Sequence, residues 1–155
     1  MKSLKIARIA AVALVAAASS SVFAAPGDTQ QLVVTANVSG VCRLTSVPAM
    51  NFTLDPSVGT DKTATSSVVY KCTKNTAPAT FTVGGVAASY SGSLSGTGGT
   101  MPYSIAWTAP TTAGSGLGAS VTGVTVTLTG TVLGTDYVNA AAGSYTETID
   151  VVIAP

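Results

Sequence analysis

Short stretches in which every second residue is apolar recur along this chain, and this period is that of a β-strand with one buried face. The stretches cover residues 32–38, 49–54, 67–72, 79–83, 102–107, 124–129 and 145–153. Between them the chain is rich in Gly, Ser and Thr, and we expect loops or irregular edges at residues 89–100 and 109–123. About six to seven short strands joined by glycine-rich turns predict an all-β protein with an immunoglobulin-like β-sandwich.

The first 24 residues have the pattern of a cleaved export signal. Three basic residues come first, the uncharged apolar run 9–18 follows, and small residues lead up to Ala24. The alternative is a membrane anchor, but the run is shorter than the roughly 20 residues that a spanning helix needs. We therefore expect cleavage after Ala24, with Ala25 as the second choice. This leaves 131 of the 155 residues, enough for one domain with its own core, and no membrane span is expected after cleavage.

Removal of the signal changes the charge of the chain. The mature part keeps four of the seven basic residues and all six acidic ones, which gives a net charge of −2. No basic patch remains, so nucleic acid and anionic membrane surfaces are unsuitable partners. Residues 75–135 contain no charged side chain at all. Two explanations stay open, namely an extracellular surface made of hydroxyl groups and a surface that packs against neighbouring copies.

Cys42 and Cys72 are the two cysteines of the chain. In an oxidising compartment an even pair indicates a disulfide, and two buried free thiols are the alternative. A bridge would close a loop of about 30 residues, to which the chain-entropy model assigns roughly 3.5 kcal/mol of stability. We expect the disulfide, because export normally brings oxidation.

The residues needed for common catalytic and metal sites are missing or scattered. The chain has no His, so it lacks a histidine acid, base or zinc ligand. Glu147 and Asp150 are close in sequence but differ in strand parity, so they point to opposite faces of a strand. The sequence contains no phosphate loop, nucleophile elbow or calcium loop. We expect no enzymatic activity, no catalytic residue, no cofactor and no metal.

Trp107 and the five tyrosines allow a second function, that of a secreted sugar-binding or adhesin module. The tryptophan alternates with Tyr103 and Ile105, and this spacing favours core packing over a place in a sugar site. The sugar-binding module is therefore kept as the alternative.

The segment after the export signal is apolar on one face. Residues 25–31 have no strand or helix pattern, and after them Leu32, Val34, Ala36 and Val38 occupy alternate positions. An alternating strand on a loose arm can leave its own domain and fill a groove in another copy by strand addition.

Several short motifs are similar to those of one known family. They are VSGVC at 38–42, MNF at 50–52, VVYKCT at 68–73, MPYSI at 101–105, and Gly130 together with AGSYTETIDV at 142–151. On these motifs the chain resembles the spore coat protein U family, the pilin subunits of archaic chaperone–usher systems, over nearly all of its mature part. Two differences are the ending Ile153–Ala154–Pro155, where the family usually has an apolar or aromatic residue, and Thr53 after Phe52, where it often has Gly.

The resemblance implies an incomplete immunoglobulin-like domain that lacks its last strand. In such subunits a periplasmic chaperone fills the gap, the arm of the next subunit replaces it, and an outer-membrane usher passes the fibre outside. The chain then divides into an export signal at 1–24, a donor-strand arm at 25–38 and a pilin domain at 39–155. The donor side chains would be Leu32, Val34, Ala36 and Val38, and the edge strand of the acceptor groove would carry Tyr145, Ile149, Val151 and Ile153.

The function that this resemblance implies is that of a structural subunit. The chain would pass through the periplasm and form a cell-surface pilus with other copies of itself or related pilins. Such a pilus would support adhesion or biofilm formation.

Overall fold

Residues 27–155 are described by the computed structural model, and they form antiparallel β-structure with one short helix. The elements are β1 (Cys42–Ser46), β2 (Lys62–Cys72), β3 (Thr80–Val83), β4 (Ser89–Gly96), β5 (Gly99–Ala106), β6 (Val124–Val132), α1 (Gly134–Tyr137), β7 (Tyr145–Thr146) and β8 (Val151–Ala154). The prediction of an all-β protein is therefore confirmed. The export signal expected at 1–24 lies outside the described residues.

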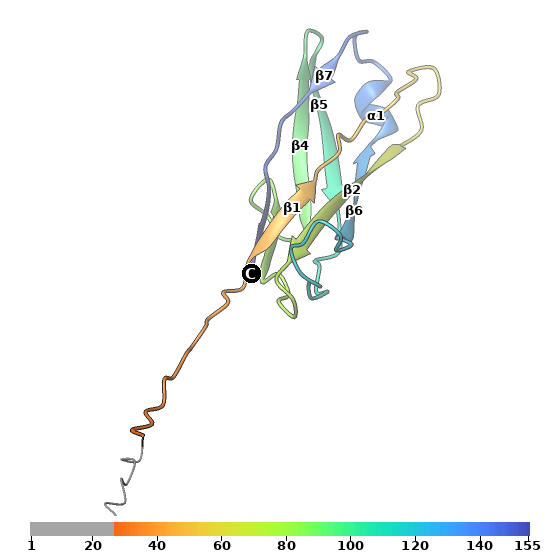
Figure 1. The fold of residues 1–155 in the computed structure, drawn as a ribbon. Helices are drawn as coiled ribbons and strands as arrows, with labels where there is room; N and C mark the ends of the chain where they lie inside the picture. The colour runs from red at the N-terminus through yellow and green to blue at the C-terminus, as the bar shows by residue number, and fades with distance from the viewer. Residues whose placement is uncertain (1–26) are drawn as a thin grey trace, which may run out of the picture. The chain divides into compact units, whose positions relative to one another are not determined.

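Within residues 27–155, six strands form one curled antiparallel sheet in the order β1-β2-β6-β5-β4-β7, most of which is visible in Figure 1. β2 and β6 lie inside this sheet and are joined by nine residue pairs, from Lys62 opposite Val132 to Tyr70 opposite Val124. Their side chains alternate between the buried core and an exposed face of Ser and Thr. The alternation of apolar and polar residues in the sequence thus arises because one face of each strand lies in the core and the other faces solvent.

β3 and β8 form a separate two-stranded sheet, in which Phe81 lies opposite Ile153. Buried side chains from both sheets and from α1 belong to one hydrophobic core. In the described part of the chain, the two largest fully buried side chains are Tyr70 and Tyr137. Their hydroxyl groups donate hydrogen bonds to main-chain carbonyls, from Tyr70 to Thr112 at 2.8 Å and from Tyr137 to Thr60. Each buried phenol therefore has the partner that burial of a polar group requires.

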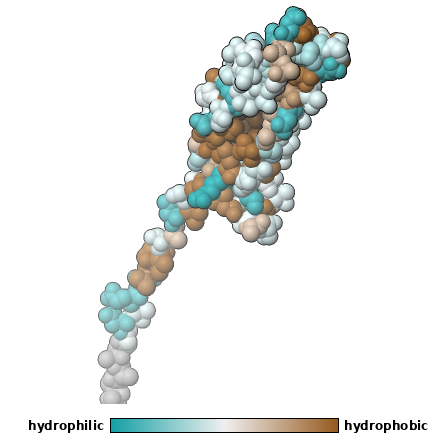
Figure 2. Space-filling model, turned by 90° about the horizontal axis from the view of Figure 1, so that it is seen from above, coloured by the Kyte–Doolittle hydropathy of each residue, from teal (hydrophilic) through white to brown (hydrophobic). Residues whose placement is uncertain are grey.

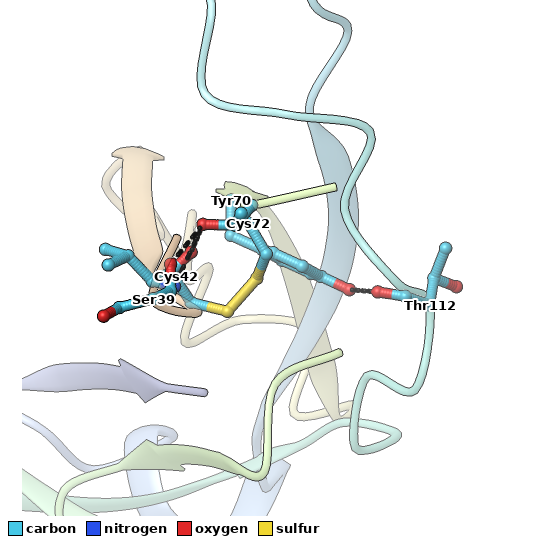
Figure 3. The surroundings of a disulfide bond; sticks show 7 residues. Ser39, Cys42, Tyr70, Cys72 and Thr112 are labelled. Atoms are coloured by element: carbon cyan, nitrogen blue, oxygen red, sulfur yellow. Dashed lines mark hydrogen bonds between the residues drawn. A yellow bond between two sulfur atoms is a disulfide. The ribbon is translucent and has the colours of Figure 1, made fainter. Parts of the chain in front are cut away.

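A disulfide joins Cys42 at the start of β1 to Cys72 at the end of β2 (Figure 3). The two residues are direct partners in the register of these strands, and both are buried. The main chain beside the bridge is also bonded, because Val41 N–H donates to Thr73 Oγ1 and Thr73 N–H donates to the Val41 carbonyl. The first strand of the domain is therefore held to β2 at the point where it begins.

The expectation of a loop or irregular edge at residues 89–100 is wrong, because this segment forms β4 and the start of β5. Gly96 lies opposite Gly99, so a two-residue turn joins the strands, and glycine favours such tight turns. The half-buried positions of β4 include Gly92 and Gly96. These glycines interrupt the apolar alternation by which a strand is recognised in the sequence.

Three of the predicted strands also differ from the structure. Residues 32–38 and 49–54 form no strand, because a strand needs a hydrogen-bonded neighbour and neither stretch belongs to a ladder of the described chain. The stretch 145–153 is not one strand but two, with β7 beside β4 in the large sheet and β8 beside β3 in the small one. Residues 147–150 between them form no strand.

Asn37–Pro155 form one compact unit, and residues 27–36 belong to another unit, whose described residues contain no helix or strand. In that second unit, Leu32, Val33 and Val34 have exposed side chains. No helix within residues 27–155 is long and apolar enough to cross a membrane.

Candidate binding groove

The compact unit Asn37–Pro155 contains an open groove with a volume of about 830 Å³. Two stretches of chain supply most of its lining, residues 47–54 as the first border and residues 143–151 without Asp150 as the second. The rest of the lining comes from strands of both sheets, namely from Ser66, Val83, Leu94, Tyr103, Ile105 and Leu128. Most of this lining is apolar, and Figure 2 shows hydrophobic residues gathered in one area on the visible face of the molecule.

The first border, residues 47–54, approaches the large sheet closely because β6 has a glycine there. Met50 and Phe52 are half-buried and line the groove. A Cβ atom on Gly130 would collide with Sδ of Met50 and would lie 2.7 Å from Cζ of Phe52. Gly130 therefore makes the space in which these two side chains pack on the sheet.

The second border contains the residues that the family resemblance assigns to an acceptor edge. Tyr145, Ile149 and Val151 line the groove. Ile153 is not part of the lining and lies opposite Phe81 in the two-stranded sheet. The structure thus brings three of the four expected edge residues together at this groove.

Both borders have main-chain groups without partners in the described part of the chain. No hydrogen bond there involves the main chain of residues 50–54 or of Thr148 and Ile149. The next position is bonded, because the carbonyl of Asp150 accepts from Gly84 N–H at 2.8 Å. Unpaired N–H and C=O groups along a strand edge are a template for pairing with another chain. The groove therefore combines an apolar lining with two borders that can bond to an added strand.

Among the described residues, Glu147 is the one charged side chain in the lining of this groove. Its Oε1 accepts a hydrogen bond from Tyr90 Oη at 2.7 Å, and its Oε2 accepts one from Ser93 N–H at 3.0 Å. A Cβ on Gly92 would lie 2.5 Å from Oε2, so the glycine leaves room for the carboxylate. The hydrogen bond to Glu147 is the main cause that raises the pKa of Tyr90. Burial, followed by the effect of Glu147, raises the pKa of Tyr103.

Trp107 does not line this groove. Its ring packs edge-on against Phe81, with ring centroids 6.3 Å apart and an interplanar angle of 69°. The indole Nε1 is buried and has no hydrogen-bond partner within the described residues. This packing agrees with the interpretation of Trp107 as a core residue.

The second border is indicated by the sequence, whereas the first is not. The alternation of Met50 and Phe52 predicts a strand, and nothing in that spacing shows that the stretch has no neighbour. Gly130 is the signal that points to the first border, because a glycine inside an alternating strand often marks a close approach of another part of the chain. Leu94 of the lining is missed because it lies in the Ser- and Gly-rich strand β4.

No curated protein and no solved structure matches this chain. The sequence model of the Spore Coat Protein U domain matches residues 28–152, which include both borders of the groove and both cysteines. This is a family of structural domains that is not known to be catalytic. The chain therefore belongs to the Spore Coat Protein U domain family, and the resemblance of its motifs is confirmed.

Proposed function

We propose that this chain is a structural subunit of a surface pilus, assembled by the chaperone–usher pathway through donor-strand exchange, and that the pilus supports adhesion or biofilm formation. Membership of the Spore Coat Protein U family is consistent with a pilin-like subunit. The observation that carries the proposal is the apolar groove whose two borders have unpaired main-chain groups. In this proposal the groove receives the arm, residues 25–38, of another copy.

The chemistry of the arm matches that of the groove. Leu32, Val34 and Val38 are 87%, 81% and 79% exposed, although large apolar side chains are normally buried. Together with Ala36 they occupy alternate positions, so one face of the extended arm is apolar. Burial of three or four such side chains would supply about 5–10 kcal/mol before the cost of ordering the arm.

An added strand would also complete the fold. The second border leads into β8, which has β3 as its ladder partner. A strand placed between the borders could pair with residues 147–151 on one side and with residues 50–54 on the other. The two-stranded sheet would then extend across the groove and cover the core. The domain is thus proposed to be an immunoglobulin-like sandwich that lacks its last strand until a partner supplies it.

The proposal assigns three partners to this groove and its arm. A periplasmic pilus chaperone would occupy the groove after export. At an outer-membrane usher, the arm of the next subunit would then replace the chaperone in the groove. The disulfide between Cys42 and Cys72 is typical of proteins in oxidising compartments outside the cytoplasm. The finished fibre would lie on the cell surface.

A single charge in the arm tests this function. Val34→Asp places a carboxylate on the apolar face of the arm, and burial of an unpaired carboxylate in the groove would be costly. We expect cells that produce this variant to lose the fibres seen by electron microscopy. Val33→Asp is the matched control, because Val33 points to the opposite face of an extended strand and its variant should assemble.

The outcomes of this experiment are distinct. Wild-type fibre yields from Val34→Asp would contradict the proposal, and loss of fibres in both variants would contradict the assignment of the donor face. A deletion of residues 25–38 complements the test. The shortened protein should still co-purify with the chaperone but should not polymerise, and fibres formed by it would exclude the arm as donor.

A further inference from the structure

The last part of the chain leaves the large sheet at Glu147. β7 is joined to β4 by two residue pairs, of which the later one in the chain places Thr146 opposite Ser95. If this antiparallel ladder continued, Ser93 would face Thr148. Instead, Ser93 N–H donates to the side chain of Glu147, at 3.0 Å from Oε2. A carboxylate therefore takes the main-chain donor that would lie opposite the departing strand.

Strand β4 is shaped to receive this carboxylate. Tyr90 donates a second hydrogen bond, of 2.7 Å, to Oε1 of Glu147. A Cβ on Gly92 would lie 2.5 Å from Oε2 of Glu147 and 2.5 Å from Cε1 of Tyr90, so no larger residue fits between them without displacement. Two residues of β4 thus hold the Glu147 side chain by hydrogen bonds, and Gly92 leaves room for it. The alternation of the sequence would place an apolar residue at this position.

We infer that Glu147 is a positioning residue for strand acceptance. Its carboxylate accepts the hydrogen bond of Ser93 N–H on β4, and so prevents the second border of the groove from pairing with β4. The main chain of Thr148 and Ile149 then stays free for an incoming strand. This inference rests on the proposed strand-accepting function. Without an acceptor at position 147, the ladder between β4 and β7 can extend from Thr146 to Thr148 and close this side of the groove.

Hydrogen exchange on the monomeric mature chain tests the positioning role. In Glu147→Ala we expect the amide of Thr148 to exchange about tenfold more slowly than in the wild type, because it can pair with Ser93 in the extended ladder. A glutamate that only stabilised the fold would give the opposite result on removal, namely faster exchange. Unchanged or faster exchange in Glu147→Ala would overturn the inference. Glu147→Gln keeps an acceptor for Ser93 N–H and a donor for Tyr90 Oη, so it should restore wild-type exchange.

Binding of a peptide tests the consequence for strand acceptance. The probe is a fluorescent peptide with the sequence of residues 27–38, added to the mature chain and followed by anisotropy. We expect Glu147→Ala to bind it about tenfold more weakly than the wild type, and Glu147→Gln to bind it as the wild type does. Asp150→Ala is the matched control, because it removes a carboxylate from the same stretch but Asp150 is not part of the groove lining.

The two experiments separate this inference from the function on which it rests. If the wild type does not bind the peptide, the strand-accepting function is wrong, and hydrogen exchange still decides the role of Glu147. If the wild type binds and Glu147→Ala binds equally well, the inference is wrong and the function stands.

Discussion

Phe52 packs edge-on against Tyr103 of β5, with ring centroids 6.3 Å apart and an interplanar angle of 65°. This contact joins the first border of the groove to the large sheet, although residues 49–54 belong to no ladder of the described chain. The border is therefore held by this packing and by the hydrogen bond that Ser66 Oγ donates to the Pro48 carbonyl at 2.7 Å, whereas the main chain of residues 50–54 has no hydrogen-bond partner in the described part of the chain. The position of Phe52 depends in turn on Gly130, because a side chain at position 130 would occupy the space of the Phe52 ring.

Gly130→Ala should displace the first border. The new methyl group would collide with Met50 and crowd Phe52, and overpacking of this kind costs about 1–3 kcal/mol in the free energy of unfolding. Urea denaturation of the mature protein measures the loss. The control is Gly118→Ala, where the nearest atom to an added Cβ is a Val121 methyl carbon at an ordinary distance of 3.6 Å. Equal stability of the two variants would show that Gly130 has no special role.

Removal of the disulfide should destabilise the domain without changing its groove. The bridge between Cys42 and Cys72 spans a sequence separation of 30 residues. The double variant C42A/C72A should therefore lose about 3.5 kcal/mol of unfolding free energy by the chain-entropy model. Urea denaturation of the variant and of the wild type, each with and without reductant, checks this value. A reductant effect that persists in the double variant would mean that the bridge is not its cause.

Alkaline pH should destabilise the domain through its tyrosines. The pKa of Tyr90 is raised mainly by its hydrogen bond to Glu147, and that of Tyr103 mainly by burial. A pKa that is higher in the folded state than in the unfolded state gives stability that is complete below the unfolded value, about 10 for tyrosine, and is lost as the pH rises through the folded value. The free energy of unfolding should therefore be lower above about pH 10 than at neutral pH, which denaturation curves at several pH values measure.

The same titration checks the contact between Tyr90 and Glu147. In Glu147→Gln the negative charge is gone, so the pKa of Tyr90 should move back towards its ordinary value, whereas burial keeps that of Tyr103 raised. Ultraviolet absorbance of tyrosinate follows both groups. An unchanged titration curve in Glu147→Gln would contradict the assigned contact.

Tyr70→Phe should loosen the long segment between β5 and β6. The Tyr70 hydroxyl donates to the carbonyl of Thr112 at 2.8 Å, as drawn in Figure 3. Loss of one such bond costs about 1 kcal/mol and leaves the carbonyl without this donor. Hydrogen exchange should accelerate at residues 109–116 and stay unchanged in the β4–β5 hairpin. Uniform acceleration over the whole domain would instead indicate a global loss of stability.

Much of the β-structure can be predicted from the sequence, because the core strands bury one face only. β2, β5 and β6 alternate between buried apolar and exposed polar residues, and their periods are visible in the sequence. β4 is not recognised in the sequence because glycines occupy two of its inward positions. These glycines leave room for the side chains of Glu147 and Tyr145. Such contacts depend on residues more than 45 positions away, so no local pattern reveals them.

The groove can be predicted only in part, because alternation shows that a stretch has an apolar face but not whether it has a neighbour. Residues 49–54 and 145–153 have the same period as paired strands, yet the first lies outside every ladder of the described chain and the second changes sheets. Glu147 interrupts the apolar face of the second stretch. In the sequence it is an exception, and in the structure it marks the point where the chain leaves β4.

The most direct test of strand acceptance is hydrogen exchange of the two groove borders before and after assembly. Monomeric mature chain and purified fibres are compared at the amides of residues 50–54 and of Thr148 and Ile149. If the arm of another copy fills the groove, amides on both borders become hydrogen-bonded and their exchange slows on assembly. Fibres in which both borders exchange as fast as in the monomer would contradict the proposed function.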